Sequence, residues 1–270
     1  MSQFLKRFTT VTFLFLYLLS LYFFGNNFFM IFTIYVIILI SFYEWIALES
    51  KSKLKTLTFF VLLLLIHKFN SINMYYISIA SLLIWTLLIL YMFINTERLK
   101  HTLKNNNNLV GFIIFSILFL HLINLHPINN ALSADNNLFD NKFYFLLLIC
   151  LVSVIDTSAY IVGKSIGKIK IITRISPNKT LEGYIGSYVF SIFFFIIFFN
   201  MNSMIWTSND LIYLSLFILL AFFGDLFISL IKRSYNVKDT SNILPGHGGL
   251  LDRLDSYIPS LPLFYLWFMI

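Results

Sequence analysis

Long apolar runs, separated by short polar stretches, occupy most of this 270-residue chain. The runs are continuous and lack the alternation of apolar and polar residues that is typical of membrane β-barrels. A segment that crosses the roughly 30 Å hydrocarbon core must satisfy its own backbone hydrogen bonds, so these runs predict helices. We therefore expect an all-α polytopic integral membrane protein with about nine transmembrane helices, the third and ninth being short. The runs lie at about 8–24, 28–48, 56–69, 74–94, 109–126, 142–163, 182–200, 211–231 and 256–270.

The composition agrees with this pattern. Hydrophobic residues make up 59% of the chain and charged residues only 11%, and the mean hydropathy is +0.84. A soluble globular protein carries about 25% charged residues, so this chain has too few polar groups to cover a water-facing surface. Its single cysteine, Cys150, excludes an intrachain disulfide and has no partner cysteine for a metal site.

The positive charges lie almost entirely on one side of the membrane when successive loops between the nine segments are assigned to alternate sides. With residues 1–7 in the cytoplasm, all but Lys68 and Lys142 of the 19 Lys and Arg residues fall on the cytoplasmic side. The positive-inside rule accounts for this asymmetry, which predicts a cytoplasmic N-terminus and an outside C-terminus. The net charge of +7 then reflects topology, and we expect no nucleic-acid partner. The first run is too long for a signal peptide and has no small-residue cleavage site, so we expect a retained helix.

The polar residues that could carry chemistry are concentrated in two cytoplasmic loops, at about 164–181 and 232–255. We expect residues 1–141, with about five helices, to be a scaffold and residues 142–270 to be the catalytic region. The asparagine run at 105–108 is expected to be a solvated loop.

Three acidic residues, Glu44, Asp156 and Asp225, lie within apolar runs. Each precedes a lysine at the cytoplasmic end of its run by seven or eight residues, which places it roughly 10–12 Å inside that end. Ionised carboxylates at such depth usually mark a function or a charge pair. For Glu44 we expect a pair with a neighbouring cation that fixes helix packing, and for Asp156 and Asp225 a function. One helical face then carries an acid at depth and cations at its mouth: Asp225, Ser229, Lys232 and Arg233.

The loop at 232–255 combines glycines, acids and bases. Three of the ten glycines fall within four residues, and glycine lets a backbone turn or approach a ligand closely. Asp252 and Asp255 would project from one face of a helix that begins near Leu251. Carboxylates suit Mg²⁺, and Lys and Arg suit phosphate oxygens, so the loop indicates phosphoryl or nucleotidyl transfer. His247 either stabilises the loop or contacts a ligand; the other histidines lack metal-ligand spacing, so zinc is not predicted.

The loop at 164–181 carries one misleading motif and one open one. Gly163, Lys164 and Ser165 look like the end of a Walker A motif, but that pattern needs a glycine at position 158, which is Ser, and a membrane helix rather than a strand precedes it, so we reject this motif. The run at 176–183 either contacts phosphate through Lys179 and its hydroxyls or simply begins the seventh helix, with an acid in the favoured first turn.

Residues 229–255 resemble the carboxyl-terminal signature of the phosphatidate cytidylyltransferases, also called CDP-diacylglycerol synthases. That signature runs unbroken from Ser-x-apolar-Lys-Arg through Lys-Asp and His-Gly-Gly to Asp-Arg-x-Asp, which is too many fixed positions for chance. The runs at 156–160 and 176–183 are also similar to the family. The resemblance is firm over residues 150–270, whereas residues 1–150 share only the hydrophobic character. The matching positions are Lys232, Arg233, Lys238, Asp239, His247, Gly248, Gly249, Asp252, Arg253 and Asp255.

The resemblance implies a reaction in which CTP and phosphatidic acid give CDP-diacylglycerol and pyrophosphate. It also implies Mg²⁺, with K⁺ as a possible second cation, and a homodimer in the bacterial inner membrane with its site facing the cytoplasm. Asp225 and Asp252 would be the metal-binding pair, with Asp156 and Asp255 as further ligands. The other catalytic residues would be Lys232, Arg233, Lys238, Asp239, His247 and Arg253. Substrate contacts would come from Ser176, Lys179, Thr180, Ser229, Gly248 and Gly249.

Three rival functions remain open to test. Buried acids also serve ion-coupled transporters, although those usually show repeated halves, and no repeat is visible here. A non-catalytic scaffold gives no reason for the loop at 232–255. The nearer rival is another CTP-dependent lipid enzyme such as a polyprenol kinase, which would transfer the γ-phosphate rather than the cytidylyl group.

Overall fold

The structure is a computed structural model of the chain, and it describes residues 9–10, 12–13, 16–17, 19–21, 23, 25–49, 52–68, 73–125, 141–173, 175–246 and 248–269. Within these residues every regular element is a helix, apart from two isolated β-bridges that join Lys170 to Thr180 and Leu244 to Gly248. The all-α prediction is confirmed for this part of the chain. The predicted first helix at 8–24 lies only partly within the described residues.

The helices follow one another along the chain with short connections. Their bounds are α2 (Asn27–Ala47), α3 (Lys53–Lys68), α4 (Met74–Ile94), α5 (Thr96–Asn105), α6 (Asn107–Asn124), α7 (Asn141–Ile166), α8 (Leu181–Met201), α9 (Ser208–Ser234), α10 (Leu251–Leu254) and α11 (Tyr257–Met269).

Six of these helices are long and apolar enough to cross a membrane, judged by length and composition: α2, α4, α6, α7, α8 and α9. They correspond to six of the nine predicted runs. The third and ninth runs form α3 and α11, which have 16 and 13 residues and are shorter than the other six. The predicted count of nine crossings is therefore not confirmed among the described residues.

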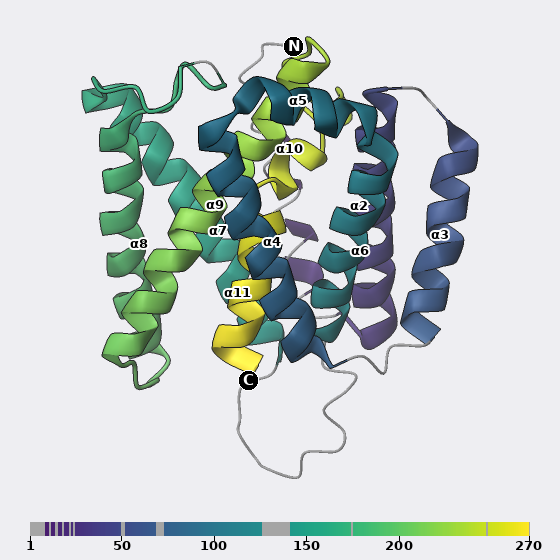
Figure 1. Cartoon of the computed structure of the whole chain (residues 1–270). Helices are drawn as coiled ribbons and strands as arrows, with labels where there is room; N and C mark the ends of the chain where they lie inside the picture. The colour runs from purple at the N-terminus through teal and green to yellow at the C-terminus, as the bar shows by residue number, and fades with distance from the viewer. Residues whose placement is uncertain are drawn as a thin grey trace.

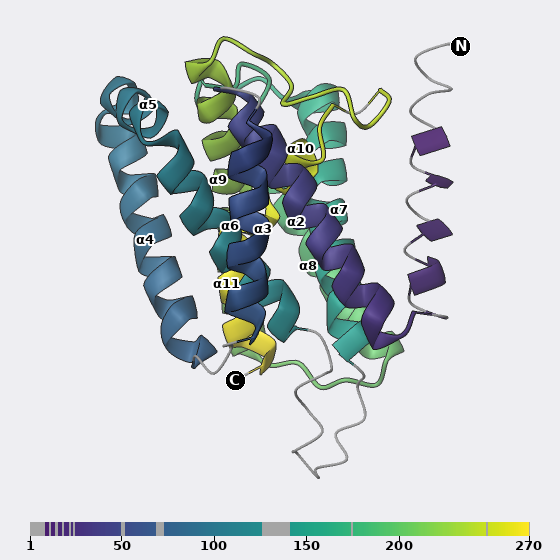
Figure 2. The ribbon, with the colours of Figure 1, turned by 90° about the vertical axis from the view of Figure 1, so that its right-hand side faces the viewer.

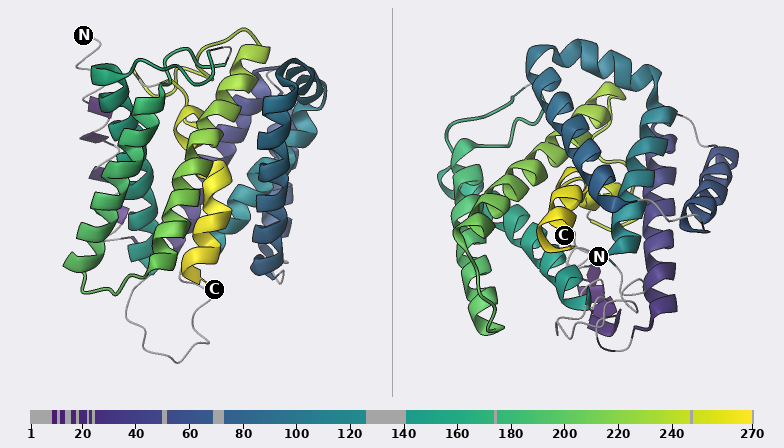
Figure 3. Two further views of the ribbon diagram at one scale, coloured as in Figure 1. Left: turned by 60° about the vertical axis from the view of Figure 1, so that its left-hand side comes forward. Right: turned by 60° about the horizontal axis from the view of Figure 1, so that its bottom comes forward.

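The helices form a bundle with α9 near its centre (Figures 1 and 3). α7 and α8 pack as a pair on one side of it, while α2 packs against α6 and α3 on the other side (Figure 1). α11 joins the two sides, because it packs against α9, α4 and α6. The outer faces of α4 and α8 carry exposed apolar side chains such as Leu87 and Phe193, as expected for surfaces that contact lipid.

Three segments that carry many of the charged residues gather at one end of the bundle. α5, the α7–α8 connection and the α9–α10 connection lie together at the top of Figure 1, whereas α11 ends at the opposite end. Helix geometry accounts for this placement, because consecutive crossings run in opposite directions. The end with α5 and the two connections is called the loop end below.

α5 corrects the prediction of a solvated loop at 105–108. Asn107 is 1% exposed, and its carbonyl accepts a hydrogen bond from Trp45 Nε1 at 2.8 Å. Leu99 and Leu103 are buried, and the Asn95 side chain caps the helix by accepting from the Arg98 backbone N–H at 3.0 Å. The asparagine run is therefore the tight junction between α5 and α6, since its members end one helix and begin the next.

The two loops predicted to carry chemistry are shorter than expected. α7 extends to Ile166 and α8 begins at Leu181, which leaves 167–180 as the first connection. Thr180 caps α8, because its Oγ1 accepts from the Gly183 backbone N–H at 3.2 Å. α9 continues to Ser234, so Lys232 and Arg233 lie in its last turn, and α10 begins at Leu251 as predicted.

Candidate active site

Asp225 on α9 forms an ion pair with Lys179 from the 167–180 connection. Ser229, one turn further along α9, donates a hydrogen bond from its Oγ to Asp225 Oδ1 at 3.3 Å. The Lys179 ammonium also lies over the Phe222 ring, 5.0 Å from its centroid. The side chains of Asp225 and Lys179 are 29% and 24% exposed, so the pair is partly buried and remains accessible to a ligand from solvent.

Two further carboxylates border Asp225. Ser256, in the turn between α10 and α11, donates from its Oγ to Asp156 Oδ1 of α7 at 3.4 Å, and its backbone N–H donates to Asp255 Oδ1 at 2.8 Å. Burial raises the pKa of Asp255 well above its usual range, and the negative charges of Asp225 and Asp156 add to this effect while Lys179 opposes it. Asp156, Asp225 and Asp255, which we call the acidic cluster, therefore share Lys179 as a counter-cation.

The acidic cluster depends on a close approach at Gly224. A Cβ at this position would lie 2.2 Å from the carbonyl oxygen of Asp255 and 2.8 Å from the ring of Pro259. Any larger residue would therefore push the α10–α11 turn away from α9. The absence of a side chain next to Asp225 lets Asp255 lie against the same stretch of helix.

Asp252 belongs to a second set of contacts. Its Oδ1 accepts from Lys232 Nζ at 2.7 Å, and both side chains are largely buried, with 9% and 12% exposed. Its Oδ2 accepts from the backbone N–H groups of Thr240 and Gly249 at 3.0 and 2.9 Å, and from Thr240 Oγ1 at 3.1 Å. Asp252 and Asp255, expected on one helical face, thus have different partners, because α10 ends after four residues.

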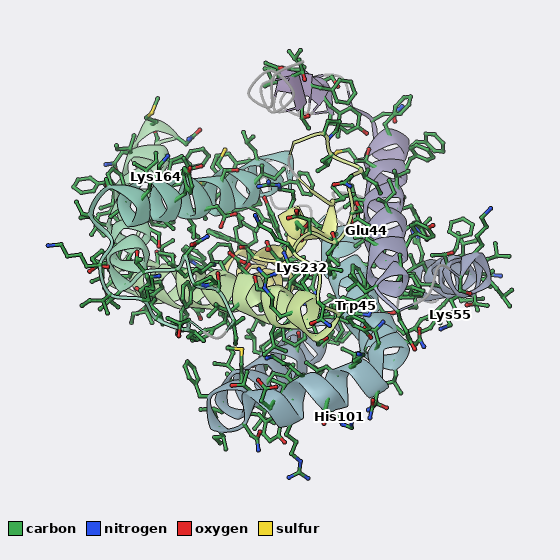
Figure 4. All side chains as sticks on the ribbon, turned by 90° about the horizontal axis from the view of Figure 1, so that it is seen from above. Glu44, Trp45, Lys55, His101, Lys164 and Lys232 are labelled. Atoms are coloured by element: carbon green, nitrogen blue, oxygen red, sulfur yellow. The ribbon has the colours of Figure 1, made fainter. Side chains whose placement is uncertain are left out.

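Glu44 corrects the expectation of a pair with a cation. Among the described residues its partners are neutral donors, all within residues 240–251, which we call the clamped segment. Oε1 accepts from Ser241 Oγ at 2.5 Å and from the Leu250 N–H at 3.0 Å. Oε2 accepts from the Leu251 N–H at 2.7 Å and from Thr240 Oγ1 at 3.3 Å. In Figure 4, Glu44 points from α2 toward the middle of the bundle, as Lys232 does, while Lys55, His101 and Lys164 lie further out.

Gly249, predicted to contact substrate, faces the protein's own groups. A Cβ there would lie 2.0 Å from Thr240 Oγ1 and 2.6 Å from Glu44 Oε2. Gly248 has a φ of 82° and accepts at its carbonyl from the Leu244 N–H at 2.9 Å. Both glycines therefore permit the fold of the clamped segment in this structure.

The remaining predicted residues lie at the loop end. Arg233, Lys238, Asp239 and Arg253 are exposed, and Arg233 Nη1 donates to the Val237 carbonyl at 3.1 Å. Ser176 is half-buried in the 167–180 connection, where its carbonyl accepts from the Lys179 N–H at 3.4 Å. His247 lies outside the described residues.

Comparison with known proteins matches residues 5–270 of the chain to the model of the cytidylyltransferase family. The chain belongs to this family. It is similar to the phosphatidate cytidylyltransferase of Bacillus subtilis (strain 168), with 38% identity over 157 residues that cover 58% of this chain and 57% of the relative.

Two relatives of the same name come from staphylococci. The protein of Staphylococcus haemolyticus (strain JCSC1435) is 44% identical over 132 residues, which cover 46% of this chain and 48% of the relative. That of Staphylococcus aureus (strain COL) is 47% identical over 125 residues, which cover 44% and 46%. The chain thus spans about half the length of the curated relatives it matches.

The acidic cluster of this cytidylyltransferase-family protein suits a hard divalent cation by its donor chemistry. Mg²⁺ takes oxygen ligands and is commonly held by one or two carboxylates together with substrate phosphates. In the described part of the chain, no group of three or more His, Cys, Asp or Glu side chains is placed to hold a metal ion unaided. The ammonium of Lys179 nevertheless pairs with Asp225, and the carboxyl groups of Asp156 and Asp255 lie near this pair, so oxygen donors suited to a cation gather at this position.

Four residues that the sequence did not assign to the site help to shape it: Glu44, Phe222, Gly224 and Ser256. For Glu44 the available signal was its depth, which equals that of Asp156 and Asp225. For Gly224 the available signal was the presence of a glycine within an apolar run, next to the acidic residue Asp225. Nothing in the sequence marked Phe222 or Ser256, because their contacts come from packing between distant segments.

Proposed function

We propose that this protein transfers the cytidylyl group of CTP to the phosphate of phosphatidate, giving CDP-diacylglycerol and pyrophosphate. Family membership and the names of the relatives support this proposal. The observation that carries it is the acidic cluster, in which Asp225 of α9 pairs with the Lys179 ammonium and Asp156 of α7 and Asp255 of the α10–α11 turn lie nearby, at the end where further cations are exposed. This arrangement suits a reaction between two phosphate-bearing substrates.

In the proposed reaction an oxygen of the phosphatidate phosphate bonds to the α-phosphorus of CTP. The bond from that phosphorus to the departing pyrophosphate oxygen breaks. A strong general base is not required, because phosphatidate is already ionised at neutral pH. Charge neutralisation and positioning are then the main catalytic tools.

The chain's own cations would supply part of that neutralisation. Lys179 is bound to Asp225 and would contact phosphate oxygens that approach the cluster. Arg233 and Lys238 are exposed at the same end and would bind the triphosphate. Lys232, paired with Asp252 at 2.7 Å, would add positive charge next to the clamped segment.

We also propose Mg²⁺ as the cofactor, held by Asp156 and Asp225. Asp225 would exchange Lys179 for the ion, and Asp252 would be available only if it exchanged Lys232. When bound, the ion would neutralise charge on the phosphate oxygens. A second, monovalent cation such as K⁺ rests on the family resemblance alone, as does a homodimer.

The proposed location is the bacterial inner membrane with the loop end in the cytoplasm, where CTP is available. Six apolar helices of suitable length support the membrane location. The basic residues support the side, because Arg98, Lys164 and Lys232 lie on α5, α7 and α9 at or near the loop end (Figure 1), while Lys68 ends α3 at the opposite end (Figure 2). The N-terminus would then be cytoplasmic and the C-terminus outside.

The proposal is tested by incubating the purified protein in mixed micelles with CTP, Mg²⁺ and phosphatidate. We expect pyrophosphate release that requires phosphatidate and yields lipid-bound cytidine in equal amount. Asp225→Asn should lower the rate by about two orders of magnitude or more, since it removes charge where the transition state needs organised electrostatics.

The matched control is Glu97→Gln, which neutralises a carboxylate that is 74% exposed on α5 and pairs with Lys100. Its rate should equal that of the unsubstituted protein. Pyrophosphate release that proceeds without phosphatidate would contradict the proposal.

A further inference from the structure

Glu44 connects two parts of the chain that are about two hundred residues apart. It lies on α2, within the predicted scaffold region 1–141, and its four donors come from the clamped segment, residues 240–251. Its side chain is 1% exposed. An ionisable residue at this depth in an apolar helix is costly unless its carboxylate is satisfied, and these four hydrogen bonds satisfy it.

The geometry of these bonds restricts the clamped segment strongly. Each carboxylate oxygen accepts one backbone N–H. Ser241 Oγ donates to Oε1, and Thr240 Oγ1 shares its single proton between Oε2 and Asp252 Oδ2, so the segment is held at both ends rather than at one point. Hydrogen bonds to an ionised acceptor are stronger than those between neutral groups. Glu44 is itself held in place, because its neighbour Trp45 bonds the Asn107 carbonyl and thereby ties α2 to α6.

Asp252 holds the same segment from the other side. Thr240 Oγ1 lies between the two carboxylates, 3.3 Å from Glu44 Oε2 and 3.1 Å from Asp252 Oδ2. Gly249 has no room for a side chain because Thr240 and Glu44 fill the space beside it. The segment therefore lies directly between a carboxylate of α2 and a carboxylate of α10.

The residues that Glu44 contacts are separated from the candidate site by only a few positions along the chain. The N–H groups of Leu250 and Leu251 begin α10, Asp252 follows at once and pairs with Lys232, and Asp255 follows three residues later in the acidic cluster. A shift of the segment would move both carboxylates relative to α9. Misplacement of about 1 Å costs about 100-fold in rate in well-organised sites.

We infer that Glu44 is a positioning residue for the cytidylyl-transfer site, acting through the clamped segment without touching substrate. The catalytic part of this inference rests on the proposed function. The anchoring of the segment is a separate, structural claim and can be measured without any activity.

The anchoring is tested with a spin label on the clamped segment. Asn242 is exposed and lies beside the Glu44 contacts, so Asn242→Cys in a Cys150→Ala background gives one labelling position. Glu44→Gln replaces one acceptor oxygen with an NH₂ group that faces donors. We expect a clearly more mobile electron paramagnetic resonance spectrum for Glu44→Gln.

The matched control is Glu49→Gln, which removes the same charge from an exposed carboxylate just after the same helix. Its spectrum should match that of the labelled parent. Ser241→Ala removes one of the four bonds, together with the bond that the Ile243 N–H donates to Ser241 Oγ at 3.1 Å. It should give intermediate mobility, so the claim stays testable if Glu44→Gln does not fold. Equal spectra for the parent, Ser241→Ala and Glu44→Gln would overturn the anchoring.

Kinetics then test the positioning role. We expect Glu44→Gln to lower kcat about 10- to 100-fold with little change in the KM for phosphatidate, because the lipid does not contact this residue. Glu49→Gln should retain the parent's kcat. A mobile segment with an unchanged kcat would overturn the positioning role. If the parent itself transferred no cytidylyl group, the proposed function would fail, and the spectra would still decide whether Glu44 anchors the segment.

Discussion

The Lys232–Asp252 ion pair allows a quantitative test of how the clamped segment is held. Its side chains are 12% and 9% exposed at an N–O distance of 2.7 Å, whereas the Lys100–Glu97 pair on α5 has a similar distance of 2.8 Å but exposures of 19% and 74%. Asp252→Asn leaves the buried ammonium of Lys232 without its counter-charge. Removing one partner of a buried pair costs about 3–5 kcal/mol, while an exposed pair contributes about 0–1 kcal/mol.

This difference is measurable as thermal stability in detergent. At about 2–4 °C per kcal/mol, we expect Asp252→Asn to lower Tm by roughly 10 °C and Glu97→Gln by no more than a few degrees, as followed by circular dichroism. In the double variant Lys232→Met/Asp252→Asn the loss should be less than the sum of the single losses, because no ammonium is left unpaired. Equal Tm values for Asp252→Asn and Glu97→Gln would refute the reasoning.

Three other predictions follow from the site and the fold. Gly224→Ala should lower both Tm and kcat, because the added methyl group cannot fit 2.2 Å from the Asp255 carbonyl; overpacking of this kind costs about 1–3 kcal/mol, and a wild-type kcat would contradict the close approach. Lys238→Gln should lower kcat/KM for CTP through lost charge stabilisation, whereas Lys55→Gln, which loses a bond to Asn108 at 3.0 Å, should leave kcat/KM unchanged. Steady-state kinetics with varied CTP test this, and equal effects of the two substitutions would mean that both cations merely set topology. A reporter fused after Ile270 should be active only if it works outside the cytoplasm, and cytoplasmic activity at that junction would overturn the proposed orientation.

Depth along a helix was the most informative sequence feature for the site. Asp156 and Asp225 lie on different helices at the same calculated distance from basic loops, and the structure brings both to the acidic cluster. Lys179, for which the sequence left open a contact with phosphate, pairs with Asp225 in this structure. Depth follows from helix rise and alternating direction, both of which can be read from a sequence.

Rotation of a helix about its axis could not be read in the same way. α2 is apolar all around, so nothing in its pattern showed that Glu44 faces the clamped segment rather than a cation. The partners of Asp252 and Asp255 were also unpredictable, because the spacing rule needs a helix longer than the four residues of α10. These features depend on contacts between segments that are far apart in the chain.

α5 was missed for a different reason. Its basic residues were used only to assign topology, although Leu99 and Leu103 at i, i+4 and the capping Asn95 were visible signals of a short amphipathic helix. Its packing against α9, where Tyr235 donates to the Lys104 carbonyl at 3.4 Å, ties it to the end of the site helix.

The central claim is that the acidic cluster serves transfer of a cytidylyl group to a lipid phosphate. The most direct measurement uses CTP labelled with tritium in the cytosine ring and with ³²P at the γ-phosphate, incubated with phosphatidate and the purified protein. We predict that the extracted lipid carries tritium without ³²P, that ³²P appears in pyrophosphate, and that Asp225→Asn abolishes both. Lipid that carries ³²P without tritium would identify a kinase and contradict the account.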